Sequence, residues 1–175
     1  MFQKGDYIIY GNTGVCLVED VSIPEESSMG DGKTLYYRLA PLRSTGLIYI
    51  PVTTTKFMRP VISRQQAQEL ICRIPHIQRD TYEGHDHRMM AEHYKNSLQS
   101  HDCADLVQLI KTIYLKNQTL AQRGKKASNT DLQYLKTAEE LLHSELSVAL
   151  DIPFEQVGTY IQESIQCMQK KEADT

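Results

Sequence analysis

The chain has 175 residues, of which 41% are hydrophobic, and a formal net charge of −3 at pH 7. This length and apolar fraction suit a soluble globular protein with one or two small domains. No stretch approaches the roughly 20 apolar residues of a membrane-spanning helix, and the start has no signal-peptide apolar core, so we expect a cytoplasmic protein without a membrane partner.

The first sixty residues carry the signals of short β-strands. Residues 7–10 and 15–18 are apolar runs separated by Gly11-Asn12-Thr13-Gly14, which predicts a strand, a tight turn and a strand. Further strands are expected over 35–39, 47–52 and 58–61, with a polar loop at 24–32. The glycine turn lacks the Lys-Ser/Thr of a phosphate-binding loop and precedes a strand, so Gly11 and Gly14 are interpreted as turn residues with positive φ. The pattern predicts a small, bent sheet or barrel.

Helical periodicity replaces the β pattern after residue 61. Ser63 can cap a helix over Arg64–Arg73, which Pro75 ends. Residues 76–87 are polar and non-periodic and are interpreted as a link between domains. Four more helices are expected between 88 and about 170; Asp102 caps the second, Gly124 ends it, Thr130 and Gln133 form a capping box for the third, and Pro153 lies in the first turn of the last. The predicted fold class is α+β, with a β-rich domain at 1–60, a helix and linker at 61–87, and a helical bundle at 88–170.

The small net charge hides a basic segment in the middle of the chain. Residues 88–126 carry seven basic and three acidic side chains, whereas residues 127–175 carry three basic and nine acidic ones. Most of these basic side chains lie on or just after the second helix of the bundle: Lys111, Lys116, Arg123, Lys125 and Lys126. They indicate either a surface that contacts nucleic-acid phosphates or a solvated helix face whose last cations interact with the helix dipole. Tyr82 adds an aromatic ring that can stack on a base.

Enzymatic chemistry finds little support in the sequence. Five histidines gather around the predicted link, at His76, His85, His87, His93 and His101, but no cysteine or carboxylate completes a known metal-binding spacing. The four cysteines form no Cys-x-x-Cys pair, which indicates free thiols in a reducing compartment. A Gly-x-Ser-x-Gly elbow is absent. We expect no enzyme, metal, cofactor or small-molecule substrate; a metal-dependent enzyme built on the histidines is the weaker alternative.

Short motifs follow one another along nearly the whole chain in an order typical of one family. The first half contains FQKGDYIIYGNTGV at 2–15, YYRL at 36–39, IPV at 50–52 and MRP at 58–60. The second half contains YKNSLQSHD at 94–102, LVQLIKTIYLK at 106–116, GKK at 124–126 and AEELLHSELSVALDIP at 138–153. Together they resemble CarD/CdnL-type bacterial transcription regulators. The β-rich module is also similar to one in transcription-repair coupling factors, but their motor needs several hundred more residues, so we expect a CarD-like protein.

The resemblance implies a two-part mode of action. A Tudor- or SH3-like β-barrel at residues 1–60 binds the β subunit of RNA polymerase, and the all-α C-terminal bundle contacts promoter DNA at the upstream edge of the bubble. There the protein stabilises the open complex through contacts that are largely independent of DNA sequence. A Tudor-like interaction module with another protein partner is the alternative.

The resemblance also implies site residues. Polymerase contacts fall on residues 21–24 and 47–51, where some relatives place an arginine on each segment and this chain has Pro24 and Tyr49. The implied polymerase-binding set is Ile23, Pro24, Arg38, Arg43, Ile48, Tyr49 and Ile50. Many relatives use a tryptophan as a wedge in DNA; this chain has no Trp, and Tyr82 is the aromatic substitute. The implied DNA-binding set is Tyr82, His87, Arg88, Lys111, Lys116, Arg123, Lys125 and Lys126.

Overall fold

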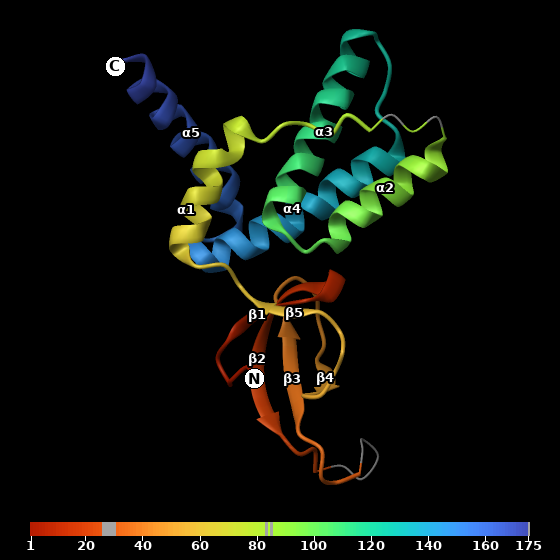
Figure 1. Cartoon of the computed structure of the whole chain (residues 1–175), viewed down its shortest axis with the longest axis vertical. Helices are drawn as coiled ribbons and strands as arrows, with labels where there is room; N and C mark the ends of the chain where they lie inside the picture. The colour runs from red at the N-terminus through yellow and green to blue at the C-terminus, as the bar shows by residue number, and fades with distance from the viewer. Residues whose placement is uncertain (26–30, 83, 85, 175) are drawn as a thin grey trace. The chain divides into compact units, whose positions relative to one another are not determined.

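The computed structural model describes residues 1–25, 31–82, 84 and 86–174, and the chain divides into two compact units. Met1–Val61 holds the strands, and Ile62–Thr175 holds the α-helices (Figure 1). Each unit packs a hydrophobic core of its own. The predicted α+β class is therefore confirmed. In the part of the chain that the structure describes, no helix is both long and apolar enough to cross a membrane.

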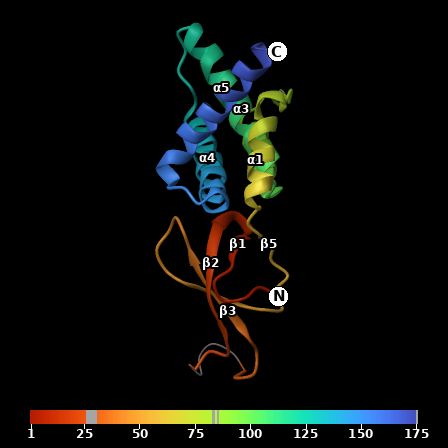
Figure 2. The same cartoon turned by 90° about the vertical axis from the view of Figure 1, so that its left-hand side faces the viewer.

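The first unit is an antiparallel sheet whose five strands were all predicted from the sequence. They are β1 (Tyr7–Tyr10), β2 (Gly14–Ser22), β3 (Tyr36–Pro41), β4 (Ile48–Pro51) and β5 (Met58–Pro60), arranged in the order β4-β3-β2-β1-β5. Strand β2 curves strongly (Figure 2), and its pairing with β3 shifts register between Val18 and Asp20, as a β-bulge does. Within the described residues the short strands β4 and β5 form the two edges of the sheet and do not pair with each other, so the predicted barrel is not closed.

Alternate side chains of the sheet fill its core. Ile8, Cys16, Val18, Tyr37, Leu39 and Ile50 are among the buried members of this cluster. Phe2 covers the core from the N-terminal segment: its ring centroid lies 6.1 Å from that of Tyr37, and its N–H donates to the Tyr37 hydroxyl over 3.1 Å. The turn between β1 and β2 has positive φ at Gly11 (45°) and Gly14 (82°), which confirms the role predicted for these glycines.

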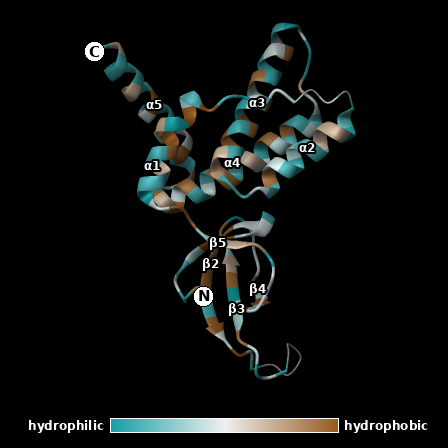
Figure 3. Ribbon diagram, viewed as in Figure 1, coloured by the Kyte–Doolittle hydropathy of each residue, from teal (hydrophilic) through white to brown (hydrophobic). Residues whose placement is uncertain are grey.

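The second unit is built from α1 (Arg64–Arg73), α2 (His87–Gln99), α3 (Cys103–Gln122), α4 (Asn129–Leu150) and α5 (Val157–Ala173). Helix α4 touches the other four helices, and α1 also packs on α5 while α2 packs on α3. Each helix carries both hydrophobic and hydrophilic residues (Figure 3), as amphipathic helices around one core do. The core includes Leu70, Tyr94, Ile113, Leu146 and Val157.

Most helix ends follow the predicted caps. Ser63 caps α1 in a capping box: its hydroxyl accepts from Gln66 N–H over 3.1 Å, and its own N–H donates to the Gln66 side chain over 2.9 Å. Asp102 caps α3 through Ala104 N–H at 2.7 Å. Gly124, with φ of 69°, follows the end of α3.

Two predicted helix starts were wrong. Helix α4 begins at Asn129 because the Ser128 hydroxyl, not that of Thr130, accepts from the N–H three residues on, that of Asp131, over 3.0 Å. Pro153 has extended backbone and precedes a 3₁₀ turn over Phe154–Gln156, so α5 begins only at Val157.

The helical unit includes the segment that leads from α1 to α2. Division of the chain at Val61 places residues 76–87 within this unit rather than between two units. Asp80 N–H donates to the Thr112 hydroxyl over 2.8 Å, and the Gln108 side chain donates to Gln78 O over 3.2 Å. These bonds hold the segment along α3.

A buried carboxylate fixes the entrance to the helical unit. Glu145 is 1% exposed, accepts from Ile62 N–H over 3.1 Å, and takes a hydrogen bond from the Cys103 thiol at 3.1 Å. Two residues further on, the Arg64 guanidinium donates to Leu150 O. The first residues of this unit are therefore bonded to α4 at two places, Glu145 and the last residue, Leu150.

Candidate protein-docking groove and nucleic-acid interface

A groove of about 550 Å³ lies on the outer side of β2, β3 and β4. Its position follows from strand register, since Asp20, Arg38 and Tyr49 lie directly opposite one another on the three strands and project from the same face. The groove is lined by Asp20, Ser22, Ile23, Pro24, Glu25, Tyr36, Arg38 and Tyr49. It combines aromatic, aliphatic and charged side chains beside an edge strand.

Strand β4 presents both side chain and backbone at this edge. Val52 N–H donates to Leu35 O over 3.0 Å, so the hydrogen-bonded pairs of the β3–β4 ladder are Tyr37–Ile50 and Leu39–Ile48. Tyr49 falls between these pairs, and its N–H and C=O therefore point away from β3. Its side chain is 41% exposed. An edge with outward backbone groups can accept a partner strand through main-chain hydrogen bonds.

Charges in the groove are paired within the sheet. Arg38 Nε lies 3.1 Å from Glu19 Oε2, with both side chains partly exposed. The Ser22 hydroxyl donates to Asp20 over 2.8 Å and lowers the pKa of that carboxyl. Asp20 therefore stays ionised at neutral pH, next to the guanidinium of Arg38.

Four of the seven residues predicted for polymerase binding meet at this groove: Ile23, Pro24, Arg38 and Tyr49. Ile48 and Ile50 point to the opposite side, where they pack in the core of the sheet. Arg43 lies on the exposed connection between β3 and β4, outside the groove lining. The alternation of strand residues could have revealed Asp20, Ser22 and Tyr36, which sequence reasoning missed.

Two of the predicted DNA-binding lysines are engaged inside the helical unit. Lys111 Nζ donates to the carbonyl oxygens of Ile74, Pro75 and Ile77 at 2.5, 3.3 and 2.8 Å, and so closes the C-terminal end of α1 and its 3₁₀ extension. Lys116 Nζ lies 2.8 Å from Asp131 Oδ2, which belongs to a side chain that is almost fully buried. We therefore assign both lysines to the fold.

Three more of the predicted basic residues directly follow the exposed C-terminal end of α3. Arg123, Lys125 and Lys126 are all exposed, and the last turns of α3 extend past α2 and α4 in Figure 1. Lys125 N–H donates to Leu120 O over 2.9 Å, and Gly124 N–H to Ala121 O over 3.0 Å. This closed C-terminal turn fixes the backbone from which the basic cluster, Arg123, Lys125 and Lys126, projects.

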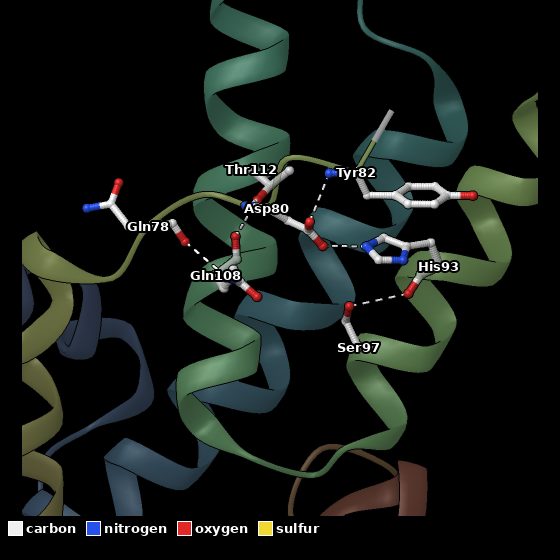
Figure 4. Close-up of polar contacts among 7 residues, drawn as sticks. All are labelled: Gln78, Asp80, Tyr82, His93, Ser97, Gln108 and Thr112. Atoms are coloured by element: carbon white, nitrogen blue, oxygen red, sulfur yellow. Dashed lines mark hydrogen bonds and ion pairs between the residues drawn. The ribbon is translucent and has the colours of Figure 1, made fainter. Parts of the chain in front are cut away.

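Tyr82 is stacked on a histidine of α2 (Figure 4). The ring centroids of Tyr82 and His93 lie 4.1 Å apart with an interplanar angle of 13°. His93 Nε2 bonds Asp80 Oδ2, and the other oxygen of Asp80 accepts from Tyr82 N–H over 2.9 Å. Burial raises the pKa of Asp80, but the bonds from Tyr82 N–H and His93 outweigh it, so that its pKa lies below the ordinary value.

His87 and Arg88 begin α2 a few residues beyond Tyr82. Both side chains are exposed, and Asp86 caps the helix by accepting from Arg88 N–H over 3.2 Å. His85, also in the predicted histidine group, lies outside the described residues. In the ranges that the structure covers, no three side chains of the His, Cys, Asp or Glu type come together as metal ligands. The four cysteines are free thiols, two of them exposed: Cys72 and Cys167.

A sheet with an open edge and a groove beside it is an arrangement that protein-interaction modules use. The family model described as the CarD-like/TRCF RID domain matches residues 2–62, which span this sheet. Residues 2–62 therefore carry a domain of the CarD-like family, a family of RNA polymerase-interacting transcription factors, and the family predicted from the motifs is confirmed for this part of the chain. The RID module is non-enzymatic in this family. A search of the curated proteins finds no match for the chain.

Proposed function

We propose that this protein is a cytoplasmic transcription regulator that binds the β subunit of RNA polymerase and stabilises the open promoter complex. The observation that carries the proposal is the match of residues 2–62 to the CarD-like/TRCF RID domain. We propose a Tudor-like role for the sheet as the polymerase-docking part, and a DNA-contacting role for the helical unit.

The docking surface that we propose is the groove together with the edge of β4. Tyr49 supplies outward backbone groups for a partner strand, and Ile23, Pro24 and Tyr36 supply apolar contact area beside it. Exposed aromatic residues at the centre of a contact contribute much of the binding free energy in many interfaces. Arg38 and Asp20 give the groove two charges of opposite sign, which favours a partner with a matching pair.

The DNA contacts that we propose come from two places in the helical unit. The basic cluster at the end of α3 suits phosphates, which need no base-specific geometry. Tyr82, with the exposed side chains of His87 and Arg88 close to it in sequence, suits the junction between paired and unpaired bases, where an aromatic ring can stack. Contacts of both kinds are largely independent of DNA sequence.

Stabilisation of the open complex requires only differential affinity. If the protein binds the open complex more tightly than the closed one, the equilibrium shifts by that ratio, and a factor of ten corresponds to about 1.4 kcal/mol. Docking on polymerase raises the local concentration of the helical unit near DNA, so weak DNA contacts suffice.

The test combines binding with promoter kinetics. Tyr49→Ala with Ile23→Ala should weaken binding of the full chain to the isolated β subunit by about tenfold or more, because both side chains leave the groove. The same variant should lose its effect on open-complex lifetime at low protein concentration and recover it at high concentration.

Tyr7→Ala is the matched control, since Tyr7 is similarly exposed (40%) but lies on β1, away from the groove. Binding that is equally weak in both variants, or unchanged in both, would contradict the proposed docking surface. Absence of any wild-type binding to β, together with an unaltered open-complex lifetime, would reject the proposed function itself.

A further inference from the structure

We propose that Asp80 and His93 are positioning residues that hold Tyr82 ready to contact promoter DNA. The inference rests on the proposed function, since it assigns the support of one of its DNA contacts. Tyr82 follows α1 and its 3₁₀ extension in a segment without regular secondary structure. A tyrosine in such a segment needs tertiary contacts to keep its ring in one orientation.

His93 supplies the first of these contacts by stacking. Its ring lies nearly parallel to that of Tyr82, with the centroids 4.1 Å apart, and it comes from the second turn of α2. A stacked partner covers one face of the tyrosine ring and fixes its tilt. Because α2 is packed on α3 and α4, the position of His93 is set by the helical core rather than by the segment itself.

Asp80 couples the backbone of Tyr82 to the same histidine. One carboxylate oxygen accepts from Tyr82 N–H over 2.9 Å, and the other bonds His93 Nε2. The main chain and the ring of Tyr82 are thus held by two groups that also hold each other. The contact with His93 further fixes the orientation of the imidazole plane on which Tyr82 stacks.

Both positioning residues are themselves anchored to helices (Figure 4). Asp80 N–H donates to the Thr112 hydroxyl on α3 over 2.8 Å, and that hydroxyl donates to Gln108 O over 2.7 Å. The Ser97 hydroxyl donates to His93 O one turn further along α2, at 3.2 Å. The support for Tyr82 therefore reaches two helices of the unit.

Gly84 lies beside the tyrosine ring. A Cβ atom at position 84 would lie 3.0 Å from Tyr82 Cε1 and 3.4 Å from Met90 N, closer than side-chain carbons normally approach. A side chain here would require the ring or the start of α2 to shift by a few tenths of an ångström. Glycine at position 84 thus leaves space for the ring of Tyr82.

This support has a direct use in a protein that lacks tryptophan. Tyrosine offers a smaller ring than tryptophan for contact with a base pair. A loosely held tyrosine ring would in addition lose conformational entropy when it becomes ordered on DNA, and this loss weakens binding. Fixing the ring in advance removes that cost. The stacked imidazole also places a second aromatic ring behind that of Tyr82.

The experiment is a double-mutant cycle on the lifetime of open complexes, measured with the full chain, polymerase holoenzyme and a promoter fragment after addition of competitor. His93→Ala should shorten the lifetime by about two- to tenfold in the Tyr82 protein, as expected for removal of one aromatic pair. In the Tyr82→Ala background, the same substitution should change the lifetime by less than about 1.5-fold, because nothing is left to position. Asp80→Asn should show the same coupling and serves where His93→Ala fails to fold.

A structural readout accompanies the kinetics. The imidazole protons of His93 should show an upfield ring-current shift in NMR spectra of the free protein, and Tyr82→Ala should abolish it. Asn96→Ala is the matched control, because this residue is exposed on the same helix and takes no part in the support of Tyr82, and it should leave the lifetime unchanged.

The outcomes distinguish the positioning role of Asp80 and His93 from the proposed DNA contact of Tyr82. If Tyr82→Ala shortens the lifetime but His93→Ala and Asp80→Asn act equally in both backgrounds or have no effect, the positioning role is overturned and the DNA contact stands. If Tyr82→Ala leaves the lifetime unchanged, the Tyr82 contact and the positioning role both fall. A wild-type protein without effect on lifetime rejects the proposed function.

Discussion

At the scale of single residues, the lysines of the helical unit divide into two groups with different tasks. Lys116 neutralises Asp131, whose side chain is 3% exposed, whereas Lys125 and Lys126 project into solvent from the end of α3. A carboxylate that is buried beside a cation depends on that cation far more than a solvated charge does. Sequence spacing gives no hint of this division.

Lys116→Met should therefore lower the free energy of unfolding by about 1–3 kcal/mol, since it takes the charge partner away from the buried carboxylate of Asp131. Lys125→Met, the matched control, should change it by less than about 0.5 kcal/mol. Urea denaturation followed by circular dichroism measures both. Equal effects of the two substitutions would contradict the structural assignment of Lys116.

A second prediction at this scale concerns His143 on α4. Burial lowers the pKa of this imidazole, and its ring lies 6.0 Å from that of Phe154, measured between centroids. Since its pKa is lower in the folded than in the unfolded protein, the unfolded state binds the extra proton more readily. Stability from this group is complete above the unfolded pKa of about 6.5 and is lost as the pH falls below it.

His143→Gln should flatten this part of the pH profile of the unfolding free energy, measured by urea titrations between pH 5 and 8. Gln133→Ala, at an exposed and non-titrating position of the same helix, is the control and should leave the slope unchanged. A profile that keeps its full slope without His143 would assign the pH dependence to other groups.

At the scale of elements, the end of α3 decides where the basic cluster lies. Gly124 has φ of 69° and allows the chain to turn back after the helix, so that Lys125 N–H reaches Leu120 O. An alanine in this left-handed conformation pays a steric cost that glycine avoids. A change at this position should therefore act on the last turn of α3 and on the residues that follow it.

Gly124→Ala should reduce the unfolding free energy by about 1–2 kcal/mol and disorder the basic cluster. Gly158→Ala is the matched control: its φ lies outside the left-handed region, and its added Cβ would meet its nearest neighbour, His143 Cε1, at 3.8 Å. The control should leave stability unchanged or raise it by about 0.5 kcal/mol. Thermal unfolding compares the two, and a larger decrease in stability at position 158 would refute the argument.

The elements also show where prediction from sequence succeeds. The five strands, α1 with its Ser63 cap, and the stop at Gly124 depend on local patterns of apolar, capping and turn residues. The predicted start of α4 was wrong because Ser128 and Thr130 are both residue types that can cap a helix. Which of the two hydroxyls accepts the backbone hydrogen bond is decided by the tertiary structure. Closure of the sheet could not be predicted, since pairing between distant strands leaves no local trace.

The candidate site was predictable to a similar degree. Tyr49 and Tyr82 stood out as aromatic residues in short polar or edge segments. The partners that define their surroundings did not, because Arg38 reaches Tyr49, and Asp80 and His93 reach Tyr82, only through tertiary structure. Lys111 caps carbonyl groups 34 to 37 residues away in sequence, which no periodicity could indicate.

At the scale of the whole molecule, the proposed function assigns one task to each unit. Each has its own core; the groove lies within the first unit, and the basic cluster and Tyr82 lie within the helical unit. Substitutions on the surface of one unit should therefore leave the task of the other intact.

Lys125→Glu with Lys126→Glu should shorten the open-complex lifetime and make it less sensitive to salt, while binding to the β subunit stays at the wild-type level. Each DNA phosphate that the variant no longer binds should reduce the logarithmic salt slope by about one unit. The control is Lys170→Glu with Lys171→Glu on the exposed end of α5, which makes the same change of net charge. An equally shortened lifetime in both variants, or weaker β binding in the first, would refute the division between units.

The bonds of Glu145 and Arg64 also have a mechanical consequence. Under the proposed function one unit binds polymerase and the other binds DNA, so a force between the two partners would act on the backbone that joins Val61 to Ile62. That tension enters the helical unit where Ile62 is bonded to Glu145 and Arg64 to Leu150, so it is shared with the middle and the end of α4 rather than unwinding α1 from its first turn. Under the proposed function, a force that reaches the start of the helical unit should therefore be borne by α1 and α4 together.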